Sequence, residues 1–141
     1  MIFKKIILVF LISVLFSLNI FANENNITVE ITGVTINGGN VFVQIYSNER
    51  DYRRDIPFMK VILESQNAIV SQEVVLPEGE YLVAAFQDTN NNGRLDTNIF
   101  GVPREPAGLT KYTGGIPRGF HSHKVPVNEN ISKITVHLNN L

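Results

Sequence analysis

Residues 81–98 read YLVAAFQDTNNNGRLDTN, an apolar run followed directly by a loop rich in Asp, Asn and Gly. The run 81–86 has the length of a strand, and its alanines indicate close packing on both faces, which is typical of a central strand. Oxygen-bearing side chains then alternate along 88–98. We therefore expect a core β-strand that ends in a turn at the rim of the domain.

Strand patterns continue on both sides of this stretch. They occupy residues 27–36, 41–46, 58–63, 68–76 and 131–138. The alternation in the first of these changes phase at Gly33, which indicates a bulge or bend, and NGGN at 37–40 is typical of a hairpin turn. The spacing predicts an all-β protein, a single antiparallel β-sandwich of the Ig-like kind with about seven strands.

Two segments show no strand pattern. The densely charged residues 47–57 predict a solvated loop or a short exposed turn of helix. Residues 101–119 are rich in Gly and Pro and lack periodicity, so we expect one long surface loop there. Loops of this length in compact domains are often functional.

The N-terminus has the layout of a secretory signal peptide, with a basic start, an apolar run and the small residue Ala22 before polar residues. The apolar run 6–21 has about 16 residues, fewer than the roughly 20 that span a membrane. We expect cleavage after Ala22, a single mature domain of residues 23–141, a periplasmic or secreted location and no membrane span after cleavage. An uncleaved anchor is the alternative.

The mature chain is mildly acidic and has no cysteine. Without Lys4 and Lys5 it has 10 basic and 13 acidic residues, a net charge of −3. This charge makes nucleic acid or an anionic membrane a poor partner. Because no disulfide can form, we expect core packing to hold the domain together, and a bound metal could add to its stability.

The loop after residue 87 has the ligand spacing of a calcium site. With Asp88 as position 1, Asn90 and Asn92 fall at 3 and 5, a glycine at 6 and Asp96 at 9, as in D-x-[DN]-x-[DN]-G. Calcium takes about six to eight oxygen ligands, and short Asp and Asn side chains at alternating positions can surround one ion. The glycine permits the turn that points the backbone carbonyl of Arg94 inward.

The loop departs from an EF-hand at position 12, which is Ile99 instead of Glu, and strand and loop flank it instead of two helices. Asp96 would supply the closing carboxylate, and Asn98 or Glu105 could add an oxygen. With two certain carboxylates we expect a modest affinity, with a Kd of about 10⁻⁴ to 10⁻³ M. A metal-free turn is the alternative, since turns also favour Asn, Asp and Gly.

Residues 81–108, with the turn that precedes them, resemble the signature of the bacterial domain-of-unknown-function family 2141 (DUF2141). The shared features are Pro-x-Gly-x-Tyr at 77–81, Asp-x-Asn-x-Asn-Gly-x-Leu-Asp-Thr-Asn at 88–98 and Phe-Gly-x-Pro-x-Glu at 100–105. The resemblance implies an exported single domain with a transthyretin-like or prealbumin-like sandwich, and it implies no activity. Residues 115–124 read GIPRGFHSHK, which departs from the Gly-Pro-Pro-x-Phe and acidic residues typical of that family.

The first functional hypothesis is an exported, non-enzymatic module. Its calcium loop would order the long loop after it, which would then bind an envelope protein or a glycan. The candidate contact residues of this binding loop are Arg104, Lys111, Tyr112, Arg118, Phe120, His121 and His123.

Two other hypotheses remain open. His121 and His123 would share a face of a strand, and with Glu105 or His137 they could hold zinc or copper in a small metal-dependent hydrolase. Histidines in polar loops are more often solvated, so we expect neither of these metals and assign no catalytic residue. The third hypothesis is a structural or assembly module that docks through an exposed sheet edge.

Overall fold

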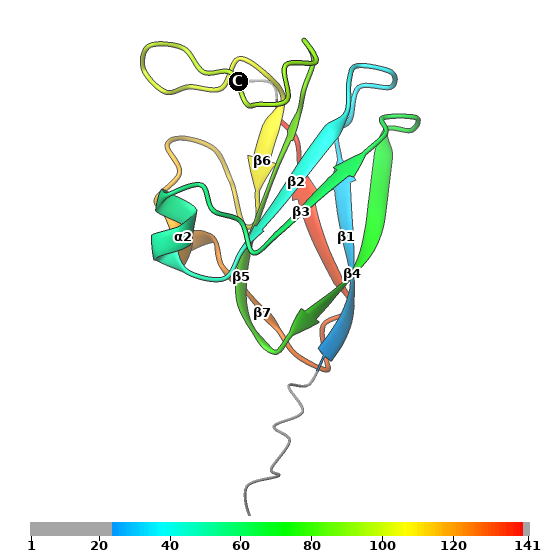
Figure 1. Cartoon of the computed structure of the whole chain (residues 1–141), viewed down its shortest axis with the longest axis vertical. Coiled ribbons are helices and arrows are strands. Elements are labelled where there is room, and N and C mark those ends of the chain that lie inside the picture. Colours follow the sequence, from blue (N-terminus) through cyan, green and yellow to red (C-terminus); the bar gives the residue numbers. More distant parts are fainter. Residues whose placement is uncertain (1–23, 140–141) are drawn as a thin grey trace, which may run out of the picture.

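The computed structural model describes residues 24–139 (Figure 1). The predicted signal peptide and its cleavage after Ala22 lie outside the described residues. Within residues 24–139, no helix is long and apolar enough to cross a membrane.

Two β-sheets pack face to face and confirm the all-β sandwich (Figure 1). The first sheet has the strand order β4-β1-β8, and the second has the order β3-β2-β5-β6, with β7 also paired to β5. The described residues thus form eight strands. Their bounds are β1 Glu24–Thr32, β2 Val41–Tyr46, β3 Met59–Leu63, β4 Ile69–Pro77, β5 Gly79–Gln87, β6 Ala107–Leu109, β7 Val125–Val127 and β8 Lys133–His137.

The predicted hairpin at 37–40 is wrong, because β1 and β2 belong to different sheets. The chain leaves β1 at Gly33, where the alternation changes phase, and crosses to the other layer. Gln87 holds this crossing from the end of β5. Its fully buried side chain accepts a hydrogen bond from the Thr35 N–H at 2.9 Å and donates to the carbonyls of Thr35 at 2.7 Å and Gly39 at 3.1 Å.

One strand pair departs from the expected antiparallel arrangement. β8 pairs with β1 in parallel, with Val29 opposite Ile134. Just beyond β8, Asn139 exchanges two backbone hydrogen bonds with Ala107 of β6, at 3.1 and 2.9 Å. This bridge links the two sheets at one side, so that the sandwich is partly closed.

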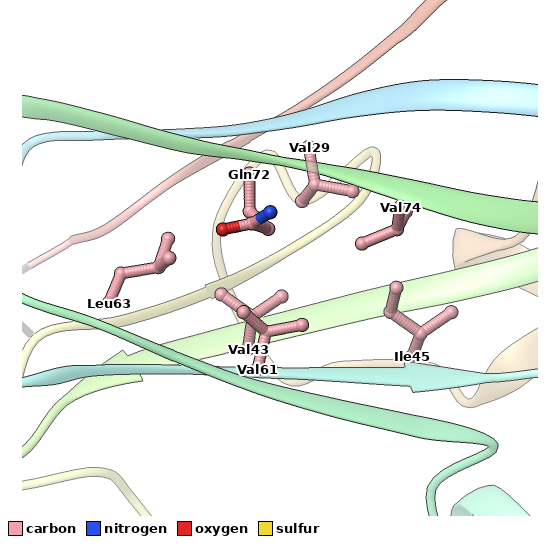
Figure 2. A pocket seen from close by; sticks show the side chains of 7 residues that line it. All are labelled: Val29, Val43, Ile45, Val61, Leu63, Gln72 and Val74. Atoms are coloured by element: carbon pink, nitrogen blue, oxygen red, sulfur yellow. The ribbon is translucent and has the colours of Figure 1, made fainter.

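The core lies between the two sheets and is apolar. Alternate residues of β1, Ile27, Val29 and Ile31, are buried there, as their period-2 pattern predicts. Figure 2 shows side chains from β1 and β4 facing those from β2 and β3 across a narrow gap. That gap has no room for a water molecule, so the interior offers no ligand pocket at this place.

The central strands β2 and β5 are covered on their outer face as well. Phe42 and Phe86 stack there with ring centroids 5.0 Å apart, and Tyr46 packs with Leu82 and Phe120. This double burial explains why residues 81–86 are apolar without alternation, and it confirms the prediction of a core strand.

The two segments without strand patterns contain short elements. Residues 47–57 include the helix α2, Glu49–Arg53, which has no buried residue, as expected. The prediction of an unstructured loop over 101–119 is wrong in part, because β6 pairs with β5 inside it. The helix α3, Phe120–His123, follows directly after it.

Candidate calcium site

The loop between β5 and β6 projects from the end of the sandwich opposite to the start of β1 (Figure 1). Asp88, its first residue, continues the pairing of β5 with β2, because its N–H donates to the carbonyl of Asn40 at 2.9 Å. The loop therefore starts from a rigid, central strand. Asp88 is 3 % exposed, so its carboxylate lies under the loop and not on its surface.

Asp88 organises the first half of the loop. Its Oδ1 accepts the N–H of Asn92 at 3.0 Å, and its Oδ2 accepts the N–H of Gly93 at 2.7 Å. The Asn92 N–H also reaches Oδ1 of Asn90 at 3.1 Å, so the oxygens of Asp88 and Asn90 lie side by side. Each carboxylate oxygen has two acceptor positions, so both oxygens of Asp88 keep one for another donor or a cation.

Asp96 is the point at which the loop side chains converge. Its Oδ2 accepts hydrogen bonds from Nδ2 of Asn90 at 2.6 Å and from Nδ2 of Asn92 at 2.8 Å. Its Oδ1 lies 3.5 Å from Nε of Arg94, whose side chain is otherwise exposed. The structure thus brings together the four side chains that the spacing predicted as ligands.

The pKa of the Asp96 carboxyl is lowered from its ordinary value of 3.8. The hydrogen bond from Asn90 is the largest cause, and partial burial opposes it. The hydrogen bond from Asn92 and the positive charges of Arg94 and Arg104 lower the pKa further.

This lowered pKa predicts a pH-dependent part of the stability. Because the folded pKa lies below the unfolded one, the stabilisation is fully present above about pH 4 and is lost as the pH falls through the folded value. In calcium-free buffer, the difference in Tm between the wild type and Asp96→Asn should be constant from about pH 7 to about pH 5 and shrink below about pH 4. A difference unchanged down to about pH 2.5 would contradict the assignment.

Glu105 closes the loop from its far end. Its Oε1 accepts the N–H of Thr89 at 2.9 Å and the Thr89 hydroxyl at 3.2 Å, while its Oε2 accepts the N–H of Asp96 at 3.1 Å. Glu105 is 3 % exposed. The sequence suggested it as a further ligand, but in the structure both of its oxygens are hydrogen-bonded to the loop itself.

Asn98 lies outside the cluster and caps a separate turn. Its Oδ1 accepts the N–H of Phe100 at 2.9 Å and that of Val102 at 3.0 Å, so it is placed to order the tip of the loop instead of contributing an oxygen. Ile99 and Phe100 at this tip are 91 % and 83 % exposed. Sequence reasoning missed this pair as a feature, although two large apolar residues inside a polar loop were a visible signal.

The donor set fits a hard cation. Oδ1 of Asn90 and Oδ1 of Asn92 accept the N–H groups of Asn92 at 3.1 Å and of Arg94 at 3.0 Å, and each keeps a second acceptor position for a cation. With Asp88, Asp96 and the backbone carbonyl of Arg94 they supply the hard oxygen ligands that calcium prefers, and water can complete the shell. Among residues 24–139, no group of three or more His, Cys, Asp or Glu side chains is placed to hold a metal, so amide oxygens are needed here.

The predicted binding loop is divided between surface and interior. Arg104, Lys111, Arg118 and His121 are exposed, and Tyr112 is half-buried with its hydroxyl donating to the Gly115 carbonyl at 2.7 Å. Phe120 is buried at 4 % exposure beside Tyr46 and Leu82. The expectation that Phe120 contacts a partner is therefore wrong, because the helix α3 turns it into the protein.

The two histidines do not share a face, since they lie in the helix α3 and not on a strand. His123 is buried, with Nδ1 3.1 Å from the Thr110 carbonyl and Nε2 accepting the N–H of Arg118 at 3.3 Å. Both ring nitrogens of His123 are therefore within hydrogen-bonding distance of backbone groups. The Thr110 hydroxyl also donates to the His123 carbonyl at 2.6 Å, an anchoring role that the sequence did not indicate.

A family described as uncharacterized proteins conserved in bacteria, DUF2141, matches residues 29–135. The match includes β2 to β7, the C-terminal part of β1, most of β8 and the whole candidate site. No curated protein and no solved structure shows a significant similarity to the chain.

Proposed function

The chain belongs to the DUF2141 family, and we propose that it is an exported, non-enzymatic binding module of the cell envelope whose loop 88–105 binds calcium. The ion would tie Asp88 to Asp96 and fix the base of the segment that follows. The exposed residues Arg104, Lys111 and Arg118 would then face an envelope protein or a glycan.

One observation carries this proposal. The amide groups of Asn90 and Asn92 meet at a single oxygen of Asp96, at 2.6 and 2.8 Å, while the carboxylate of Asp88 accepts the N–H groups of Asn92 and Gly93. A turn needs fewer side chains than this to close, because backbone hydrogen bonds and one Asn or Asp are enough. Four oxygen-bearing side chains in one loop can supply about half of the six to eight oxygens that a calcium ion takes.

The hydrolase hypothesis receives less support from the same structure. A histidine that binds a catalytic metal must offer a free ring nitrogen, and both nitrogens of His123 are hydrogen-bonded to the backbone. The gap between the sheets is too narrow for water. A binding module requires neither feature.

Calcium should bind to the chain without residues 1–22 and raise its melting temperature. If Kd is about 10⁻⁴ M, an ion concentration of about 10 mM is about 100 times Kd and adds about 2.7 kcal/mol, or roughly 10 °C in Tm. Asp96→Asn should reduce the affinity at least about tenfold, because it removes one of two carboxylate ligands. Isothermal titration and differential scanning calorimetry measure both effects.

The matched control is Glu129→Gln, which makes the same charge change at an exposed residue between β7 and β8. It should bind calcium as the wild type does. Absence of heat on titration, together with an unchanged Tm at about 10 mM calcium, would overturn the proposal.

A further inference from the structure

The tip of the calcium loop exposes apolar side chains that the proposed function does not use. We define the apolar tip as Ile99, Phe100 and Val102, which are 91 %, 83 % and 42 % exposed. Large apolar side chains grouped on a projecting loop mark an interaction site more often than scattered ones do. We propose that this tip inserts into the headgroup region of a phospholipid membrane, with the calcium ion bridging to lipid phosphates, an inference that rests on the calcium site above.

Four backbone donors in and around the tip are hydrogen-bonded within the turn. The N–H groups of Asn98 and Gly101 donate to the carbonyls of Val102 at 2.8 Å and of Asn98 at 3.0 Å. Those of Phe100 and Val102 donate to the Asn98 side chain. Unpaired backbone donors are costly in an apolar medium, and these four are already paired within the turn.

The calcium site is suited to bridging, because the chain supplies few strong ligands. Asp88 and Asp96 are its two carboxylates, and calcium takes about six to eight oxygens. The remaining positions are open to water or to phosphate oxygens. The tip starts at Ile99, three residues beyond Asp96 in the sequence, so the tip and the proposed ion belong to the same loop.

The local charge depends on the ion. Residues 88–105 contain three acidic and two basic residues, a net charge of −1 that becomes +1 with one calcium ion. Arg94 and Arg104, both exposed, flank the tip and can contact lipid phosphates. The mature chain as a whole has a net charge of −3, so attraction to an anionic surface requires the ion.

Vesicle binding tests the proposal with the chain lacking residues 1–22. Vesicles of phosphatidylglycerol and phosphatidylcholine should co-sediment with the protein in calcium and not in EDTA. Pure phosphatidylcholine vesicles should bind it less. The double variant Ile99→Ser, Phe100→Ser should lower the partition coefficient at least about tenfold, because it removes most of the insertable apolar surface.

The matched control is Ile116→Ser. Ile116 is 90 % exposed but lies in the segment between β6 and α3. The end of this segment lies beside α2 (Figure 1), because the N–H of Phe120, the first residue of α3, donates to Oε2 of Glu49 in α2 at 3.0 Å. This variant should bind vesicles as the wild type does. All variants should keep the wild-type Tm, because the replaced side chains are exposed.

A fluorescent reporter distinguishes insertion from loose adhesion. The chain has no tryptophan, so Phe100→Trp introduces a single one at the tip. Its emission should shift to shorter wavelength when vesicles and calcium are added, as expected for an indole in the interfacial region. The same reporter at Ile116→Trp should not shift.

Two outcomes separate this inference from the calcium site. Heat of calcium binding without vesicle binding would overturn the membrane inference alone. Vesicle binding that needs the tip but persists in EDTA would overturn the calcium bridge.

If the wild type forms a dimer that the double variant loses, and no vesicle binds, the tip is a contact between protein copies and the membrane proposal is wrong.

Discussion

Replacing Gly39 by alanine should destabilise the protein by about 3–5 kcal/mol, a large part of the stability of a typical domain. A Cβ at Gly39 would lie 1.9 Å from the Asp88 carbonyl oxygen, and its φ is +99°. Both causes act together, because alanine is strained at this φ and the backbone of Asp88, directly after β5, blocks the new atom. Denaturant unfolding in EDTA would measure the loss.

Gly114→Ala is the matched control for this prediction. Gly114 has a similar φ of +108°, but a Cβ there meets no atom within 4 Å. It should cost only the conformational strain, about 1–2 kcal/mol. Equal losses for the two variants would mean that the contact between Gly39 and Asp88 does not restrict the fold.

The Gly39 variant should also weaken calcium binding. Relief of the clash requires Asp88 or the 33–40 crossing to move, and Asp88 is the first ligand of the proposed site. The carbonyl of Gly39 accepts a hydrogen bond from Gln87 at 3.1 Å, so the crossing cannot shift freely. The candidate calcium loop therefore depends on a turn about fifty residues earlier in the chain.

Much of the fold could be predicted from the sequence, because local patterns decide it. The apolar composition of residues 41–46 and 81–86 predicts two buried strands, and their positions agree with β2 and β5. The pairing of strands was harder to predict. A phase change at Gly33 is compatible with a bulge and with a crossing between sheets, and the buried Gln87 that decides between them lies far away in the sequence.

The short elements were missed for a related reason. β6 has three residues, too few to show a period, and it forms because β5 offers an unpaired edge there. The spacing of the two histidines would put them on one face of a strand, but Gly119, with φ +92°, starts the helix α3 just before them. One turn of helix then buries His123 and leaves His121 exposed.

The candidate calcium site was easier to predict than its surroundings. Its four side chains lie within nine residues, so spacing alone nearly fixes their geometry. Glu105 is different, because its role depends on how the chain returns to β6. An acid near a calcium pattern resembles a ligand in the sequence, whereas the structure uses both of its oxygens to join the two ends of the loop.

Glu105→Ala should therefore destabilise the protein by about 2–4 kcal/mol even without calcium. The change removes three hydrogen bonds and leaves the N–H groups of Thr89 and Asp96 without their partner. A hydrogen bond to a charged acceptor contributes about 1.5–3 kcal/mol, and these three are only partly buried. Unfolding in EDTA measures this effect, and Glu129→Ala, at an exposed acid, should change stability by less than about 0.5 kcal/mol.

Glu105→Gln distinguishes two roles of Glu105. It is either a structural clasp, meaning that its hydrogen bonds join the two ends of the loop, or a calcium ligand. An amide keeps one acceptor oxygen but turns an NH₂ group toward a backbone donor, so a clasp predicts a stability loss of about 1–2 kcal/mol in EDTA. A ligand predicts the reverse, with stability unchanged in EDTA and calcium binding abolished. If Glu105 is the clasp, Glu105→Gln should weaken calcium binding only in proportion to the loosening of the loop, and less than Asp96→Asn does. The two titrations, read with the two unfolding curves, decide which residues hold the ion and which hold the loop in place for it.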